Sequence, residues 1–192
     1  MDKLIFLFRR KEGLTRKEFF DHYLDVHAPL GKRVTQTMRG YTVNLVDTES
    51  GLDAVTEIWT ESAADFMDPA KSFATPEDAA ELMADHDSFL GPFEAYIVEE
   101  KIVSGEVPDA PLGAVGPSSK LVSLHHDAHP LSDDPGAALG VVENRVVQKI
   151  TPDARDFALI RLVWAPDAEA FGALEDDAVL VREYRQMEPG HD

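Results

Sequence analysis

Four side chains in the first half of the chain are candidates to move a proton, and His27 leads them. His27 follows Phe20, Tyr23 and Leu24 at helical spacing, so the four residues share one helix face. An imidazole titrates near pH ~6.5 when unperturbed and therefore suits general acid/base catalysis. The same spacing also fits a structural role, in which the helix dipole and the backbone hold a histidine at the end of its helix.

Tyr41, Glu57 and His86 complete the candidate catalytic residues. Tyr41 would orient a carbonyl or a phenol, although a strand tyrosine fits a hydrophobic core equally. Glu57 would act as a base if burial raised its pKa. His86 falls in an apolar helix stripe and is either a core histidine or a proton donor. The candidate substrate-binding residues are Tyr23, Trp59, Arg39 and His125.

The sequence H-H-D-A-H holds His125, His126 and His129 and is the densest group of metal-ligand types. Neighbouring residues of a strand point to opposite faces, and no helical H-x-x-x-H pair with a glutamate is present, so we predict no metal site. One of His125 and His126 would instead face the interior of the second sheet. No phosphate-binding loop or nucleophile elbow occurs, and we predict no cofactor.

The elements that must position these residues can be placed from the sequence. Thr15 and Glu18 form a capping box, and Pro29 disfavours helix at Ala28, so a helix is expected to end near His27. Further helices are expected after Ser62 and from Thr75. Apolar runs and alternation predict strands at Leu4 to Phe8, Gly40 to Val46, Ala54 to Thr60 and Ala95 to Val103. This β-α-β-β-α-β order is the ferredoxin-like pattern.

A linker divides the chain, because residues 104–118 hold three glycines and three prolines in fifteen residues. We predict residues 1–103 as the domain that carries the site and 119–192 as a degenerate repeat. Asp127 to Ala138 is too short and too rich in Pro, Asp and Gly to hold the first helix. The expected strands of this repeat are Leu121 to His125, Gly140 to Val146, Phe157 to Trp164 and Ala178 to Met187.

Each ferredoxin-like unit has helices on one sheet face and leaves the other, largely apolar face in need of a partner. The predicted fold class is therefore α+β, with tandem ferredoxin-like repeats that form an intrachain α+β barrel with antiparallel sheets.

Composition excludes several classes of function. The net charge of −18 argues against nucleic-acid binding and against anionic membranes, and no apolar run is long enough to span a bilayer. The chain has no cysteine and no signal-peptide core, which predicts a cytoplasmic protein. Basic residues concentrate before Tyr41. Arg9, Arg10 and Arg39 are either ordinary solvated cations or attract an anionic substrate to a cavity mouth.

The pattern F-x-x-x-Y-x-x-x-H-A-P-L resembles the signature of the EthD family of small α+β barrel proteins. It is carried by Phe19, Tyr23, His27, Ala28, Pro29 and Leu30. Leu4 to Arg10, Asp53 to Trp59 and Ala80 to Phe89 resemble further family segments, although an acidic residue is more usual at His86. In this family the partner sheet usually comes from a second copy, so the resemblance allows a homodimer here, and it implies that His27 lines the barrel cavity.

The family's relatives include isomerases, cyclases, decarboxylases and proteins with no known activity. We therefore predict a cofactor-independent enzyme that uses acid/base chemistry on a small aromatic or lactone-like molecule, by isomerisation, elimination, cyclisation or decarboxylation. One alternative is a noncatalytic protein that binds a small ligand or serves as an accessory. Another is a haem or oxygen-dependent oxidoreductase, because related barrels include such enzymes.

Overall fold

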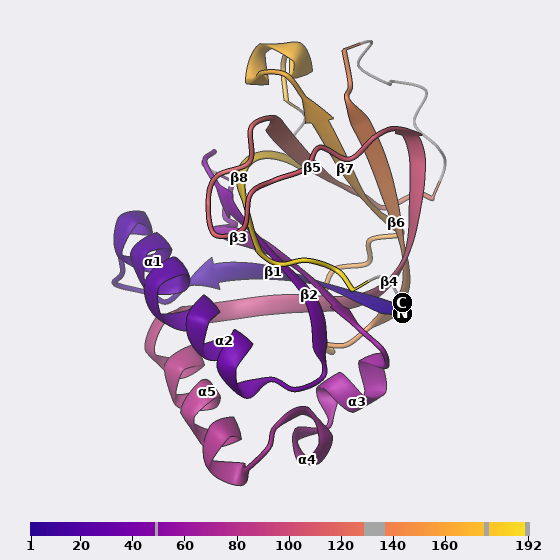
Figure 1. The fold of residues 1–192 in the computed structure, drawn as a ribbon. Coiled ribbons are helices and arrows are strands. Elements are labelled where there is room, and N and C mark those ends of the chain that lie inside the picture. Colours follow the sequence, from indigo (N-terminus) through magenta and orange to yellow (C-terminus); the bar gives the residue numbers. More distant parts are fainter. Residues whose placement is uncertain (49, 129–136, 175–176, 191–192) are drawn as a thin grey trace.

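The computed structural model describes residues 1–48, 50–128, 137–174 and 177–190. Its strands form a closed antiparallel barrel in the order β1-β3-β2-β8-β5-β7-β6-β4 (Figure 1). The strands are β1 Asp2–Arg10, β2 Met38–Val46, β3 Ala54–Thr60, β4 Leu90–Gly105, β5 Ser119–His125, β6 Gly140–Lys149, β7 Leu159–Ala165 and β8 Ala178–Met187. The predicted fold class is confirmed.

The two halves of the chain contribute equivalent sheets to the barrel. The order β4-β1-β3-β2 in the first half and β8-β5-β7-β6 in the second both place the fourth strand beside the first and the second beside the third. The seams are antiparallel pairs between β2 and β8 and between β4 and β6. The barrel therefore closes within one chain, and the second half covers the face that an isolated first half would expose.

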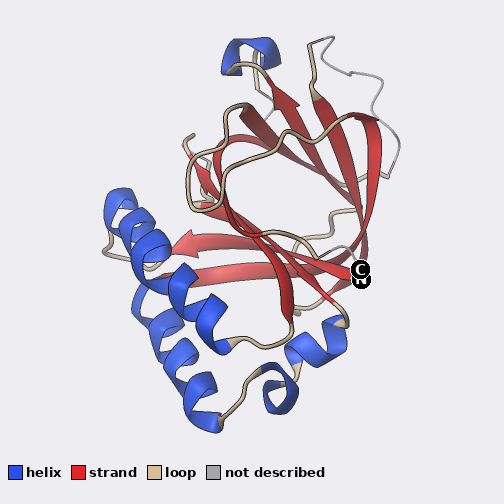
Figure 2. Ribbon diagram, viewed as in Figure 1, coloured by secondary structure: helices blue, strands red, loops and turns tan. Residues whose placement is uncertain are grey.

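The α-helices cover the outer face of the first sheet (Figure 2). They are α1 Arg16–His22, α2 Ala28–Val34, α3 Ala63–Met67, α4 Pro69–Ser72 and α5 Pro76–Phe89. The predicted caps are present: Thr15 and Glu18 form the capping box of α1, Ser62 caps α3 and Thr75 caps α5. The only helical element among the described residues of the second half is the 3-10 turn η2, Ala168–Phe171. Most of Asp127 to Ala138, where we predicted that no first helix exists, lies outside the described residues.

The first helix does not end at His27, so that prediction is wrong. A π-helical turn, η1 (Tyr23–His27), follows α1 and passes directly into α2, and the N–H of Ala28 donates to the carbonyl of Tyr23. Proline in a regular α-helix clashes with the carbonyl four residues earlier. The wider turn makes room before Pro29, which then lies in the first turn of α2, where a missing N–H costs little.

Strand alternation sorts the side chains of the first sheet into two cores. Leu4, Phe6 and Phe8 pack with helix residues such as Phe19 and Phe89. Lys3, Ile5 and Leu7 face the barrel interior, because alternate residues of a strand point to opposite faces. Ile5 and Leu7 share this interior with apolar residues of the second half.

The predicted linker packs against the barrel. After Gly105, the chain runs beside β8, where the N–H groups of Gly113 and Gly116 donate to the carbonyls of Arg185 and Glu183. Val115 also forms an isolated bridge to Tyr184. This segment therefore covers one side of the barrel. In the described part of the chain, no helix has the length and apolarity to cross a membrane.

Candidate functional site

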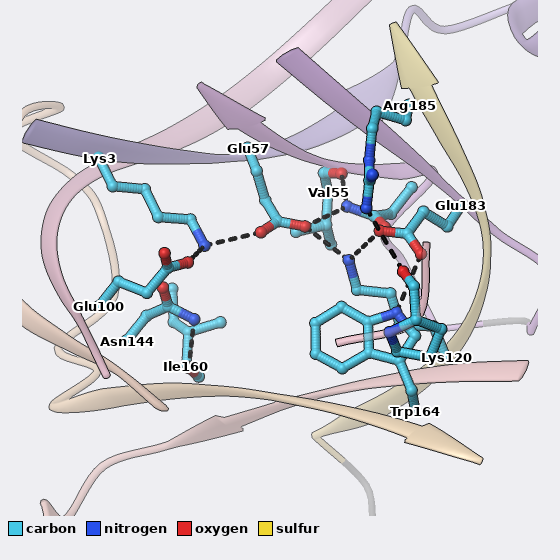
Figure 3. Close-up of polar contacts among 12 residues, drawn as sticks. Lys3, Val55, Glu57, Glu100, Lys120, Asn144, Ile160, Trp164, Glu183 and Arg185 are labelled. Atoms are coloured by element: carbon cyan, nitrogen blue, oxygen red, sulfur yellow. Dashed lines mark hydrogen bonds and ion pairs between the residues drawn. The ribbon is translucent and has the colours of Figure 1, made fainter. Parts of the chain in front are cut away.

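Two matching sets of charged and aromatic side chains meet inside the barrel, and Figure 3 shows the lysines and carboxylates of both sets together with Trp164. In the first half, the Lys3 ammonium lies 4.5 Å from the centre of the Trp59 ring and pairs with Glu100. In the second half, Lys120 lies 4.5 Å from the centre of the Trp164 ring, and its Nζ is 3.0 Å from Glu183 Oε1. Each lysine pairs in register with its tryptophan, on β1 and β3 or on β5 and β7.

An asparagine completes each set. The Nδ2 of Asn44 donates to the carbonyl of Val55 at 2.9 Å, and the Nδ2 of Asn144 donates to the carbonyl of Ile160 at 3.1 Å. Asn44 stands opposite Glu183 across one seam of the barrel, and Asn144 stands opposite Glu100 across the other. The seams therefore bring each asparagine to the carboxylate of the other half.

Glu57 breaks this symmetry and links the two sets. Its Oε2 is 2.7 Å from Lys3 Nζ, and its Oε1 is 2.6 Å from Lys120 Nζ. It lies two residues before Trp59, where the second half has Leu162 two residues before Trp164. One buried carboxylate thus serves two buried ammonium groups.

Ion pairing between the buried lysines and carboxylates keeps the side chains of this network charged. We expected burial to raise the pKa of Glu57. Burial does act in that direction, but Lys120 and Lys3 outweigh it and hold the pKa of the carboxyl far below its ordinary value. Burial likewise opposes the charge of Lys120, yet Glu183 and Glu57 outweigh it and hold that pKa above its ordinary value. Glu57 is therefore a permanent anion and a poor base.

A cavity of about 590 Å³ opens onto the first set. Its wall includes Lys3, Glu57, Trp59 and Glu100, and the exposed residue Glu99 also lines it. The Glu100 side chain is 34% exposed, whereas Lys120 and Glu183 of the second set are 1% and 5% exposed, although Trp164 and Glu183 also line the cavity. Of the two lysine–carboxylate pairs, Lys3–Glu100 is thus the one with both members on the cavity wall and with the more accessible carboxylate.

Four of the residues predicted for the site gather elsewhere, between the helices and the outer face of the first sheet. His27 Nδ1 is 2.7 Å from Asp85 Oδ2, and the same carboxylate pairs with His22. The ring of His86 lies 4.9 Å from that of His27. The hydroxyl of Tyr23 is 2.7 Å from Thr56 Oγ1, and Tyr41 interacts with Tyr23. We call His22, Tyr23, His27, Tyr41, Asp85 and His86 the helix-face cluster.

The expectation that His27 reaches the space between the sheets is wrong. Tyr41 and Thr56 precede Thr42 and Glu57 by one residue each, so they point to the opposite face of the sheet. Burial raises the pKa of Tyr23 to about 12, and it raises the pKa of Tyr41 well above its ordinary value. Burial, aided by the nearby His27, lowers the pKa of His86 to about 4. Both tyrosines and His86 are therefore neutral at pH 7.

The remaining predicted residues lie apart from the cavity. Arg39 is exposed and pairs with Glu61 at 2.9 Å. His125 Nε2 is 2.9 Å from Ser123 Oγ on the outer face of the second sheet. Arg9 and Arg10, offered as anion attractors, pair instead with Glu94 and Asp53.

His129, the last histidine of the H-H-D-A-H stretch, lies outside the described residues. His126 Nδ1 is 2.8 Å from the carbonyl oxygen of Asp156, a contact that uses one ring nitrogen. Within the part of the chain that is described, no three His, Cys, Asp or Glu residues are placed to hold a metal ion.

Sequence reasoning found Glu57 and Trp59 and weighed Asn44 as a weaker candidate on the face opposite Tyr41. It missed the other members of the interior network: Lys3, Glu100, Lys120, Asn144, Trp164 and Glu183. A signal was present. Asn44 and Asn144 follow Gly40 and Gly140 at the same spacing in the repeated strands. A polar residue kept at the same place in both repeats, on strands that bury both faces, indicates an interior role.

The cavity does not fit haem. Haem iron takes its protein ligand from His, Cys, Met or Tyr. Among the described residues that line the cavity, Met1 is the single member of these types, and it is 60% exposed. No step of the chemistry considered below passes through haem.

The closed antiparallel barrel of two ferredoxin-like halves defines the chain as an α+β barrel protein. Residues 11–92 match the family model of the EthD domain, the family that the signature resembles. No curated protein matches the chain.

Solved structures share the fold across nearly the whole chain. An anthrone oxidase-like protein is similar with a TM-score of 0.62 and 8% identity, covering 98% of this chain and 94% of its own. A putative monooxygenase from Fusobacterium nucleatum subsp. nucleatum gives a TM-score of 0.56 and 10% identity, covering 100% and 96%. A mutant chlorite dismutase from Candidatus Nitrospira defluvii, in complex with cyanide, gives 0.50 and 10%, covering 95% and 90%. At these identities the likeness is one of fold.

Proposed function

We propose that the protein is an enzyme that transfers a proton on a small aromatic or lactone-like molecule held in the barrel cavity. The observation that carries the proposal is the Lys3–Glu100 pair: both of its residues line the cavity, whereas in the matching Lys120–Glu183 pair only Glu183 does. We therefore propose that Lys3 and Glu100, in place of His27, carry the chemistry.

Each side chain of the accessible set has a role in this chemistry. The Lys3 ammonium would stabilise the negative charge that develops on a carbonyl or lactone oxygen. Glu100 would take the proton from the neighbouring carbon and return it to another atom, which converts one isomer into another or expels a leaving group. Trp59 provides a flat apolar wall, and Glu57 holds Lys3 in place. Isomerisation, elimination, cyclisation and decarboxylation can all proceed through such an enolate.

A second candidate function is noncatalytic binding of a small ligand. The observation in its favour is that Lys3 already contacts Glu57, Glu100 and the face of Trp59, so a substrate oxygen would have to displace one of them. A noncatalytic protein could hold its ligand in the cavity without any ligand atom replacing a contact of Lys3.

Hydrogen–deuterium exchange distinguishes the two functions without knowledge of the full reaction. Cyclic ketones, lactones and phenylacetaldehydes are incubated with the protein in deuterium oxide, and label at the carbon beside the carbonyl is followed by NMR. We expect the wild-type protein to accelerate exchange for at least one compound, and Glu100→Gln to reduce that rate ~10²–10⁴-fold, the usual contribution of a positioned acid/base.

Two matched variants interpret that loss. Glu169→Gln removes a carboxylate on exposed η2 and should leave the exchange rate unchanged. His27→Gln tests the helix-face cluster. If His27→Gln abolishes exchange in a folded protein while Glu100→Gln does not, the proposed location is wrong. If the wild-type protein binds compounds but exchanges none, the noncatalytic function holds.

A further inference from the structure

We propose that the barrel cavity selects a positively charged, amine-bearing molecule and discriminates against carboxylates. This inference rests on the proposed function for the location of the site, and it adds the charge class of the ligand. It argues against one of the two alternatives for Arg9, Arg10 and Arg39, that they attract an anionic substrate.

The charge of the cavity wall is the first support. Among the described residues that line it, seven are aspartate or glutamate, and two, Lys3 and Arg185, are cationic. Glu99 and Glu188 are exposed members of this lining. Clefts lined by one sign of charge focus the field and concentrate ligands of the opposite sign.

The two cations of the wall are already engaged, which is the second support. Lys3 pairs with Glu57 and Glu100. Arg185 Nη1 is 2.8 Å from Asp109 Oδ1 and 3.3 Å from Glu188 Oε2. A bound carboxylate would have to compete with two protein carboxylates at either cation and would enter a wall with excess negative charge.

Unpartnered acceptors provide independent support. The Oδ1 atoms of Asn44 and Asn144 have no hydrogen-bond partner, although both residues are fully buried. Each side chain lies on the same strand face as a cavity-lining residue two positions away, Thr42 or Val142. Their Nδ2 groups donate to backbone carbonyls, which fixes the amide orientation. Neither asparagine is itself part of the cavity wall, but the adjoining barrel interior holds two unpaired acceptors, which a ligand with N–H donors that extends past Thr42 or Val142 would complement.

A series of three ligands with one ring and different charge tests the inference. Phenethylamine, phenylacetamide and phenylacetate are cationic, neutral and anionic at pH 7. Their Kd values for the full-length protein are measured by isothermal titration calorimetry at low and at high salt. We expect the amine to bind at least ~10-fold more tightly than the carboxylate, and we expect this ratio to shrink as salt screens the wall.

Variants assign the preference to the cavity. Glu99→Gln/Glu188→Gln should lower the ratio of carboxylate Kd to amine Kd about threefold or more, whereas Glu169→Gln, which removes one charge far from the cavity, should leave it unchanged. Circular dichroism confirms that each variant is folded.

Two outcomes would overturn the inference. One is phenylacetate binding as tightly as phenethylamine. The other is an amine preference that survives the double variant, because the preference would then come from the overall charge of the protein. Neither result contradicts the proposed function if phenylacetamide binds, because binding of this neutral compound shows that the cavity accepts a small aromatic molecule independently of charge. If all three compounds fail to bind at millimolar concentration, the charge inference is wrong, and the exchange experiment alone decides the proposed function.

Discussion

At the scale of single residues, the shared carboxylate of Glu57 determines which substitutions the barrel can tolerate. Lys3 and Lys120 are buried, and both contact Glu57, but each also has a carboxylate of its own, Glu100 or Glu183. Removal of a charge from this network therefore has unequal consequences. A lost lysine leaves a buried carboxylate undercompensated, whereas loss of Glu57 leaves two complete pairs.

We expect Lys120→Met to lower the free energy of unfolding by about 3–5 kcal/mol, the usual cost of an uncompensated buried charge. Glu57→Leu should cost less than about 2 kcal/mol, because leucine already occupies the matching position, Leu162, and both ion pairs persist. Urea unfolding followed by circular dichroism measures both values. A Glu57→Leu variant less stable than Lys120→Met would show that Glu57 holds the network together.

His86 makes stability depend on pH. Its pKa is about 4 in the folded chain, below the ordinary value of 6.5. Between these values the unfolded chain binds a proton that the folded chain does not, so stability falls as pH falls. His86 alone should lower the free energy of unfolding by about 2 kcal/mol from pH 7 to pH 5.

Urea titrations of the wild-type protein and of His86→Gln at the two pH values measure this contribution. The variant should lose less stability than the wild type, and the difference isolates His86 from Asp85, whose lowered pKa acts in the same direction. Equal losses in the two proteins would place the pH dependence on other groups.

Part of the site could be predicted from the sequence because two of its residues lie close together on one strand. Glu57 and Trp59 stand out as polar and aromatic residues on one face of a short strand. Lys3 precedes the apolar run that predicted its strand, so it looked like an ordinary flanking cation. Its partners lie 54 and 97 positions away and meet it only once the barrel closes. Pairing across that separation leaves no periodic signal.

At the scale of elements, most ends of helices and strands could be predicted from the local sequence. The main error is the predicted end of the first helix, and its cause is also local. The predicted strands Ala54 to Thr60 and Ala178 to Met187 match β3 and β8. The first helix runs past its predicted end because η1 accommodates Pro29. The standard proline rule describes the α-helix and does not anticipate a π turn. The family signature spans this turn, which sets the spacing between Tyr23 and His27.

The exit from β4 depends on a glycine, Gly105. Its φ of +65° is disfavoured for other residues, and an added Cβ would lie 2.0 Å from the carbonyl oxygen of Leu139. Gly105→Ala should therefore cost at least about 3 kcal/mol, since the backbone must move at the seam with β6. Gly113→Ala is the control: its φ is +71°, with open space at the Cβ, so only the ~1 kcal/mol of backbone strain applies. Chemical denaturation of both variants checks the difference. Equal costs would mean that the close approach at Gly105 relaxes freely.

At the scale of the whole molecule, the chain repeats one sheet twice and lets each copy complete the other. The duplicated strand order was predictable from the order of elements in the two halves. The duplicated lysine, tryptophan and carboxylate sets were not, because their members are scattered among strands whose register only the closed barrel defines. The expected homodimer stays a prediction, since closure within the chain already covers the inner face of the first sheet.

Residues 1–103 expressed alone should dimerise or aggregate. The fragment would expose Ile5, Leu7 and Val55, which the second half buries, and large exposed apolar faces drive association. It would also remove Lys120 from Glu57 and leave β2 and β4 as open edges. Light scattering after size-exclusion chromatography measures the mass, with the full-length chain as reference. A fragment that remains a stable, soluble monomer would contradict the view that the two halves form one cooperative barrel.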